Sequence, residues 1–250
     1  MCTEAPGLAK HTARVAGRIL LNPVQNRLIE LLPAPDRARL LAACEPVNLM
    51  SGEVLNVIGS EVRHVYFPTQ ASISLVSTVD EHPGLEVGLV GHEGMLGTAL
   101  VLGVSAAPAR AVVQGAGASW RISAAAFRRE LKASVALQRQ LSLYLYVLMS
   151  QAVSSAGCLR FHLVGQRLAR WLLMSQDRAL DAQFQVTHEF LACMLGVRRV
   201  GVTVAAGALR SRGLIGYHRG KLTVLDRPGL EAAACSCYAA DRRVYAQYLG

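Results

Sequence analysis

Residues 186–224 have the sequence VTHEFLACMLGVRRVGVTVAAGALRSRGLIGYHRGKLTV, and this stretch decides the fold of the C-terminal part of the chain. Thr187 is placed to cap a helix, because its hydroxyl can accept from backbone N–H groups of the first turn. An apolar face follows at helical spacing, formed by Phe190, Leu191, Met194 and Leu195. Gly196 can end this helix, because glycine adopts the left-handed conformation at little cost.

A second helix is predicted after a tight turn at Val197. Its core side would be formed by Val202, Ala205, Ala206 and Leu209, which recur at helical spacing. Its opposite side would carry Arg198, Arg199, Val200, Thr203, Val204 and Gly207. Gly213 closes this helix, and residues 214–224 form a short hairpin that turns at Gly220. Two helices, a tight turn and a hairpin predict a winged helix-turn-helix, which places one helix in the major groove of DNA.

A helical hairpin without a ligand is the alternative interpretation of this stretch. Two adjacent arginines, Arg198 and Arg199, oppose the dipole at the start of the second helix. An anionic partner at that end removes the objection. We therefore predict double-stranded DNA as the partner, with His218, Arg219 and Lys221 near the phosphates at the hairpin tip.

The segment resembles the DNA-binding domain of the cyclic-AMP-receptor/fumarate-nitrate-regulator (Crp–Fnr) family of bacterial transcription factors. The resemblance is carried by Val186-Thr187, Leu195-Gly196-Val197, Arg199, Val202, Leu209 and Gly213-Leu214-Ile215. It extends more weakly upstream to about Leu32. It implies a homodimeric, cytoplasmic transcriptional regulator, with RNA polymerase as a further partner.

The resemblance also assigns roles within the second helix. Arg199 aligns with the family arginine that recognises guanine through a bidentate contact. Val200 stands where the family often has glutamate, and Val204 where cyclic-AMP-type members often have arginine. We therefore expect an operator that differs from the cyclic-AMP-receptor site, with Val200 or Val204 contacting thymine methyl groups. The other candidate DNA-binding residues are Thr187, Arg198, Thr203, His218, Arg219 and Lys221.

Composition supports this division of the chain. The chain has 250 residues, of which 52% are hydrophobic, so one or two domains with ample core material are expected. Residues 158–250 hold 13 Lys/Arg against 6 Asp/Glu, whereas residues 1–157 hold 13 against 11. A basic C-terminal part beside a near-neutral N-terminal part fits a DNA-binding domain joined to a sensor or dimerisation domain.

The N-terminal two-thirds has the pattern of a small β-barrel or jelly roll. Short β-rich runs occur at 54–58, 65–67, 73–78, 85–90, 110–113 and 118–122, separated by turn residues. Their order fits the family's cyclic-nucleotide-binding-like β-roll. We therefore predict an α+β chain with an N-terminal arm (1–22), a β-roll with flanking helices (23–132), a dimerisation helix (133–157) and the winged helix-turn-helix (158–250).

The roll lacks part of the family's cyclic-nucleotide site. Arg110 is placed as the phosphate arginine, but Ala111 replaces the serine that follows it. The family's Gly-Glu-Leu stretch corresponds to the region of Gly94, Met95, Gly97 and Thr98, where no glutamate follows either glycine. A cyclic phosphate needs a positive charge and several donors, and its ribose needs an acceptor. We expect no cyclic-AMP binding and no other cofactor, while an unidentified small-molecule effector at these residues stays an open alternative.

Residues 133–157 form a helix that is apolar on nearly all sides. Leu137, Leu141, Leu145, Leu148, Ala152 and Ala156 give one stripe, and further apolar residues lie on the other sides. Such a helix must be buried on both sides. A homodimer satisfies this if one side packs on the roll and the other on a second subunit, whereas a monomer would need it as a central helix.

The six cysteines suggest no disulfide framework. Cys158 and His162 could share a helix face, and Cys235 and Cys237 could lie close together, so either pair could bind a soft metal or sense oxidation. Each pair lacks two further ligands in sequence, so we predict no metal site. No run of 18 uncharged apolar residues and no secretory leader occur, which predicts no membrane span.

Two other functional classes are alternatives to a DNA-binding regulator. A ligand, metal or redox sensor of the same fold would have conditional or vestigial DNA binding. An enzyme is disfavoured because no nucleophile elbow, phosphate loop, zinc-protease helix or spaced carboxylate pair occurs.

Overall fold

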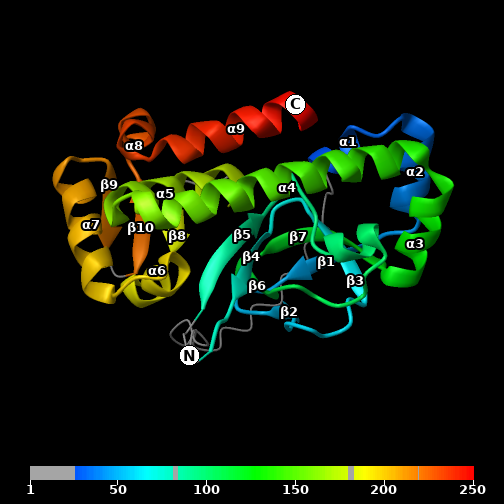
Figure 1. Ribbon diagram of the computed structural model, residues 1–250, viewed down its shortest axis with the longest axis horizontal. Helices are drawn as coiled ribbons and strands as arrows, with labels where there is room; N and C mark the ends of the chain where they lie inside the picture. The colour runs from blue at the N-terminus through cyan, green and yellow to red at the C-terminus, as the bar shows by residue number, and fades with distance from the viewer. Residues whose placement is uncertain (1–25, 81–83, 180–182, 219) are drawn as a thin grey trace, which may run out of the picture.

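The computed structural model describes residues 26–80, 84–179, 183–218 and 220–250. The predicted N-terminal arm, residues 1–22, lies outside them. In the described part, β-rich and helical elements of the N-terminal half are followed by a long helix and a C-terminal helical domain with a small sheet (Figure 1). The predicted α+β class is confirmed.

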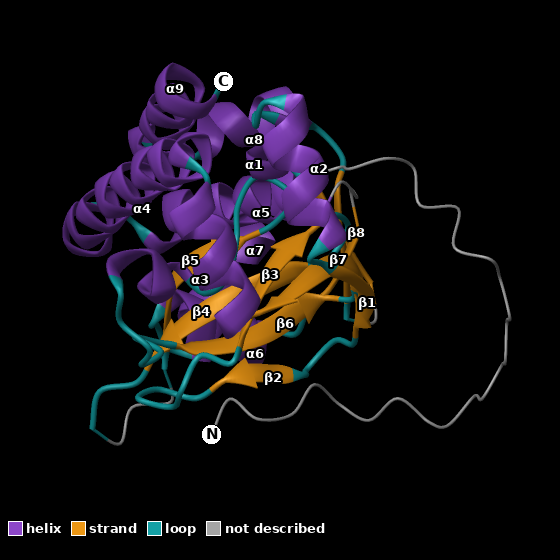
Figure 2. Cartoon of the chain, turned by 90° about the vertical axis from the view of Figure 1, so that its right-hand side faces the viewer, coloured by secondary structure: helices purple, strands orange, loops and turns teal. Residues whose placement is uncertain are grey.

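The β-roll consists of two antiparallel sheets. One has the strand order β1-β7-β3 and the other β2-β6-β4-β5. The bounds are β1 Glu45–Leu49, β2 Val54–Asn56, β3 His64–Pro68, β4 Ser72–Ser77, β5 Leu85–Val90, β6 Arg110–Gly115 and β7 Gly117–Ser123. Figure 2 shows these strands on one side of the molecule and the long helices on the other.

Short helices close one end of the roll. They are α1 Arg27–Glu30, α2 Ala34–Ala42, the 3₁₀ helix η1 Thr98–Leu102 and α3 Ala124–Ala133. Their apolar side chains meet the strands in one core, in which Leu28, Ile29, Phe67 and Phe127 are at most 1% exposed. Burial of four such side chains contributes several kcal/mol and fixes the helices on the roll.

The long helix α4 runs from Val135 to Phe161 and so passes the predicted domain boundary. Ser134 caps its start by accepting from the Leu137 N–H at 3.0 Å. Gly157, predicted to end the helix, lies inside it and has open space where a Cβ would stand. The helix therefore runs one turn beyond the predicted 133–157, and Cys158 in that turn is 3% exposed.

By length and mean hydropathy, α4 is long and apolar enough to cross a membrane. One side of it is nevertheless part of the roll core, since Leu137, Leu141, Tyr144 and Val147 are at most 2% exposed. The rest of α4 is largely exposed in the single chain, since 22% of its most apolar 18 residues are buried.

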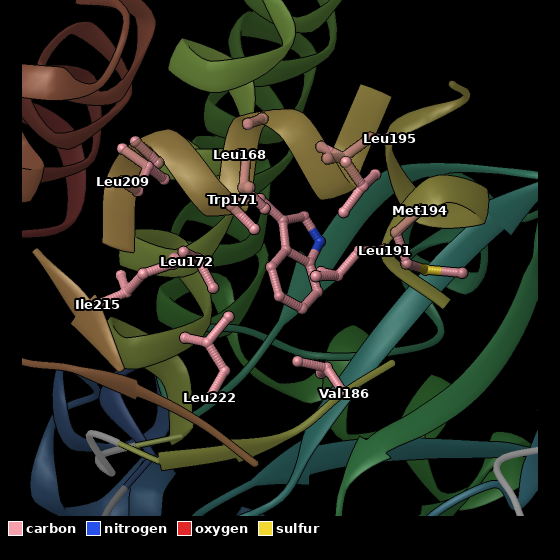
Figure 3. Close-up of a cluster of buried hydrophobic side chains, with 14 of the residues drawn as sticks. Leu168, Trp171, Leu172, Val186, Leu191, Met194, Leu195, Leu209, Ile215 and Leu222 are labelled. Atoms are coloured by element: carbon pink, nitrogen blue, oxygen red, sulfur yellow. The ribbon is translucent and has the colours of Figure 1, made fainter. Parts of the chain in front are cut away.

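The C-terminal domain contains four helices and a three-stranded sheet in the described residues. The bounds are α5 Val164–Ala179, β8 Gln183–Gln185, α6 His188–Leu195, α7 Arg199–Ser211, β9 Ile215–His218, β10 Lys221–Val224 and α8 Arg227–Ala233. The sheet order is β8-β10-β9, so β8 adds a strand that the sequence pattern did not indicate. Trp171 lies at the centre of the core, among Leu168, Leu172, Leu191 and Leu222 (Figure 3).

The last helix, α9 Ser236–Leu249, leaves this domain and runs along α4 (Figure 1). Tyr248 packs edge-on against Tyr146 of α4 with ring centroids 4.9 Å apart. Leu249 is 1% exposed in the roll core, and Tyr245 donates to the Glu93 carbonyl at 2.7 Å. Residues 236–249 therefore pack on the N-terminal part, which corrects the prediction that 158–250 form one domain.

Candidate nucleic-acid interface

Two helices, α6 and α7, form the candidate DNA-binding unit. Thr187 caps α6 by accepting from the Phe190 N–H at 3.0 Å, as its sequence position predicts. Gly196 ends α6 with φ +60°, which places the chain in the left-handed region, and the Val197 N–H closes the turn on the Ala192 carbonyl. The two helix axes differ by 107°, within the range of helix-turn-helix motifs.

The two faces of α7 have opposite characters. Val202, Ala205, Ala206 and Leu209 are at most 7% exposed and pack in the domain core, as predicted. The other face is exposed and carries Arg198, Arg199, Val200, Thr203, Val204, Gly207 and Ala208. Val200 and Val204 are 67% and 68% exposed. This helix thus presents methyl groups to solvent on a face that begins with two arginines.

Arg198 and Arg199 stand at the positively polarised end of α7. Arg198 is the N-cap residue and Arg199 the first residue of the helix. Neither forms an ion pair with a carboxylate in the residues that the structure describes. The positive charges of the guanidinium groups and of the helix dipole therefore add at the start of α7. A DNA phosphate or an acceptor on a base edge would compensate this charge.

The wing lies beside this helix. His218 ends β9 and Lys221 begins β10, and the two are paired in register where the hairpin turns. Both side chains are exposed. Arg219, the third predicted residue of the wing, lies outside the described residues. Lys221 also pairs with Gln185 of β8, so the wing is braced by a third strand.

His188 carries no signal of its own in the sequence, but it links the two helices. The Thr203 hydroxyl donates to the Arg199 carbonyl at 3.1 Å, so His188 Nδ1 donates to Thr203 Oγ1 at 3.0 Å. The His188 ring lies 4.8 Å from that of Tyr217 in the wing. Burial lowers the pKa of His188, and the charge of Arg199 lowers it further. A neutral His188 thus connects α6, α7 and the wing; only its place just after the Thr187 cap could have indicated it.

The residues predicted to hold an effector occupy different surroundings. Met95 is 1% exposed in the roll core, and its N–H donates to Tyr144 Oη at 3.2 Å. A Cβ at Gly94 would lie against the same oxygen. Gly97 has φ +104° and precedes Thr98, the first residue of η1. Arg110 lies partly exposed at the start of β6, paired with Val76. The effector prediction for these residues stays a prediction.

Four metal-ligand side chains come together elsewhere. In sequence, the pair Cys158 and His162 and the pair Cys235 and Cys237 each lack two ligands. In the structure each pair supplies the ligands that the other lacks, because α9 begins beside the end of α4. The prediction of no metal site considered each pair separately, whereas the structure places the two pairs together.

Comparison with known proteins identifies a C-terminal domain by sequence and the overall fold by structure. Residues 166–233 match the Crp-like helix-turn-helix domain. FixK2 from Bradyrhizobium japonicum is similar over 77% of this chain and 98% of its own, with a TM-score of 0.65 and 13% identity. The c-di-GMP-responsive global regulator CLP from Xanthomonas campestris is similar over 77% and 99%, with a TM-score of 0.62 and 17% identity.

A third solved structure has the same arrangement. TTHA1359, a CRP/FNR-family transcriptional regulator from Thermus thermophilus, is similar over 76% of this chain and 98% of its own, with a TM-score of 0.62 and 22% identity. A comparison by sequence with curated proteins returned no match. The resemblance to the Crp–Fnr family is confirmed in its helix-turn-helix domain and in its fold.

Proposed function

We propose that this chain, which carries a Crp-like helix-turn-helix domain within the fold of Crp/Fnr regulators, is a cytoplasmic, homodimeric transcription factor that binds specific double-stranded DNA. The observation that carries the proposal is the exposed face of α7. It combines two arginines, neither of them ion-paired within the described residues, with two valines that are 67% and 68% exposed. The opposite face of the same helix packs in the core of the domain.

The chemistry of that face divides into recognition and positioning. Arg199 offers a planar donor pair that matches the O6 and N7 acceptors of guanine. Val200 and Val204 offer only methyl groups, which suit the C5-methyl group of thymine. Arg198, His218 and Lys221 suit phosphates, which fix the register of the protein without specifying sequence. We therefore expect an operator that differs from that of the cyclic-AMP receptor.

Homodimerisation is supported by a face of α4 that the roll leaves open and that α9 contacts only at Tyr146. Ser142, Tyr146, Met149, Val153 and Ala156 recur along it at steps of four and three residues. Tyr146, Met149 and Val153 are 45%, 59% and 72% exposed. A heptad stripe of this kind is the seam of a two-helix coiled coil. A two-fold pair would then present two α7 helices to half-sites about one helical turn apart.

Independence from cyclic AMP is supported by the packing at Gly94 and Met95. Tyr144 of α4 occupies the space next to Gly94 and accepts from the Met95 N–H, so a protein side chain fills the space beside two residues that the resemblance assigns to the nucleotide site. Ligand binding there would require Tyr144 to move out of the core, in which it is 2% exposed.

The test is selection of bound sequences from random duplex DNA with purified protein and no added ligand. We expect a two-fold symmetric site to be enriched and its affinity to fall steeply as salt rises, because phosphate contacts release counterions. Enrichment of the unaltered cyclic-AMP-receptor consensus would contradict the roles given to Val200 and Val204.

A failed selection by folded, dimeric protein would favour the alternative, a sensor whose DNA binding is conditional. The roll contains a cavity of about 280 Å³ lined by Asn56, Glu61, Arg63, His64 and Tyr66 among others. Ligands would then be screened for a shift in melting temperature, which binding to the folded state raises.

A further inference from the structure

The end of α4 and the start of α9 bring three thiols and one imidazole together. Cys158 lies in the last turn of α4, and His162 caps that helix four residues later. Cys235 caps α9, and Cys237 is its second residue. Cys158 and Cys235 are 3% and 4% exposed, whereas Cys237 and His162 are partly exposed. The pairs are separated by more than 70 residues in sequence and meet only because α9 runs back along α4.

The distances within the cluster match a single tetrahedral ion. Cys158 Sγ lies 3.5 Å from Cys235 Sγ, and Cys237 Sγ lies 3.6 Å from His162 Nδ1. All four ligand atoms lie within 4.8 Å of one another. A zinc–sulfur bond of about 2.3 Å places two sulfurs of a tetrahedral centre about 3.8 Å apart. The four ligand atoms are therefore spaced to surround one ion.

The surroundings supply positive charge. Arg167 and Arg170 are 9% and 7% exposed and line one cavity with Cys158. Arg170 is paired with Asp241 at 2.7 Å, while its buried Nε has no partner in the described residues. Arg167 donates to the Leu195 carbonyl, and no carboxylate pairs with it in the described part of the chain.

That charge distribution suits a bound metal thiolate. A divalent ion held by three thiolates and a neutral imidazole has a net charge of −1, which would compensate a buried guanidinium that lacks a carboxylate among the described residues. Thiolate sulfurs also accept hydrogen bonds from neighbouring N–H groups, the kind of outer partner that metal ligands usually have.

We propose that Cys158, His162, Cys235 and Cys237 bind one zinc ion in a closed Cys₃His site. Sulfur and imidazole ligands in a tetrahedral set select zinc over magnesium or calcium, and four protein ligands leave no open position for catalysis. The site is structural. It fastens α9 to the corner between α4 and α5, the joint through which the helix-turn-helix domain is attached to the long helix.

The test begins with metal analysis of untagged, full-length protein purified under reducing conditions without chelator. We expect about one zinc per chain. Protein stripped of metal should bind added Co²⁺ alone and show the visible absorption bands of tetrahedral thiolate coordination. Stripping should lower the melting temperature, and Zn²⁺ alone should restore it, because an ion bound only to the folded state stabilises that state.

Two variants make the assignment specific. Cys237→Ser and His162→Gln change partly exposed ligands, and both should lose the bound zinc and the response of melting temperature to chelator. Cys44→Ser changes a free thiol in the roll and should behave as wild type in both assays. Circular dichroism of each variant establishes that it is folded.

Three results would overturn the zinc site. Stripped wild-type protein that gives no thiolate bands with Co²⁺ would do so, as would folded Cys237→Ser protein that keeps a full equivalent of zinc. A disulfide between Cys158 and Cys235 in protein purified under anaerobic conditions, found by mass spectrometry without reduction, would replace the metal site with a covalent link. None of these measurements uses DNA, so their outcome is separate from that of the proposed regulatory function.

Discussion

At the residue scale, the predicted DNA interface depends on a contrast between Arg199 and its neighbours. Among the predicted base-contact residues of α7, Arg199 is charged, whereas Val200 and Val204 carry only methyl groups. The hydroxyl of Thr203 is engaged with the Arg199 carbonyl and with His188, so its first role is to hold the start of α7. Specificity for guanine should therefore be concentrated in one side chain.

We predict that Arg199→Ala will lose about 1–3 kcal/mol of specific binding and relax preference at one base position in each half-site. Lys221→Ala serves as the matched comparison, because it removes a predicted phosphate contact. This variant should weaken binding to all DNA sequences equally and reduce the salt dependence of the affinity by about one counterion. Fluorescence anisotropy on the selected operator and on single-base variants measures both effects. If Arg199→Ala keeps the wild-type affinity and base preference, its assignment is wrong.

At the element scale, strand β5 and helix α5 join the roll to the helix-turn-helix domain through the partly buried carboxyl group of Glu86. Trp171 Nε1 donates to Glu86 Oε1 at 2.9 Å, and the Ser74 hydroxyl donates to Glu86 Oε2 at 2.7 Å. Burial raises the pKa of Glu86 to about 7, against the opposing effects of these hydrogen bonds and of the charges of Arg178 and Arg170. Packing of β5 on α5 therefore favours the neutral acid.

This raised pKa makes stability depend on pH. Because the folded state holds the proton more tightly than the unfolded state, the stabilisation is complete below the ordinary pKa of 4.5 and is lost as pH rises through about 7. We predict that wild type will lose on the order of 2 kcal/mol of unfolding free energy over this range relative to Glu86→Gln. Urea unfolding of both proteins from about pH 5 to pH 8 measures the difference. Parallel pH profiles would show that Glu86 does not titrate in this way.

At the scale of the whole molecule, α4 is the element whose sides face different surroundings. The roll covers one side, and α9 packs along another, where Tyr248 contacts Tyr146. Met149 and Val153 are left exposed, at 59% and 72%. Exposed apolar stripes on long helices mark interaction surfaces, because water contact with them is unfavourable. The sequence alone could not show which face of α4 packs on the roll, which on α9 and which stays exposed, since the helix is apolar on nearly all sides.

We predict that Val153→Asp will convert the dimer into a monomer, because a carboxylate at the centre of a helix–helix seam would be buried without a partner. Val57→Asp is the control, since Val57 is also exposed, at 57%, but lies in the roll. Sedimentation equilibrium should give about twice the 26.8 kDa chain mass for wild type and control and about the single mass for Val153→Asp. A dimeric Val153→Asp would place the interface elsewhere.

Loss of the dimer should also weaken DNA binding. Two linked reader helices bind a two-fold site with a high effective concentration, which a monomer lacks. Monomeric Val153→Asp should therefore bind the two-fold operator and an isolated half-site with similar affinity, as measured by anisotropy.

By itself, the sequence determined the local elements of this protein. Thr187, Gly196 and the spacing of Val202, Ala205, Ala206 and Leu209 specify cap, turn and buried face through interactions a few residues apart, and the strands of the roll follow from equally local patterns. Apart from strand β1, which the sequence pattern did not indicate, these elements were predicted because backbone capping and side-chain periodicity act over short range.

Only the tertiary structure decided how distant segments meet. The return of α9 along α4, the continuation of α4 through Gly157, the contact of Glu86 with Trp171 and the cluster of Cys158, His162, Cys235 and Cys237 all join residues from separate elements. No local pattern encodes such contacts, because they depend on which apolar faces are buried together when the whole chain packs.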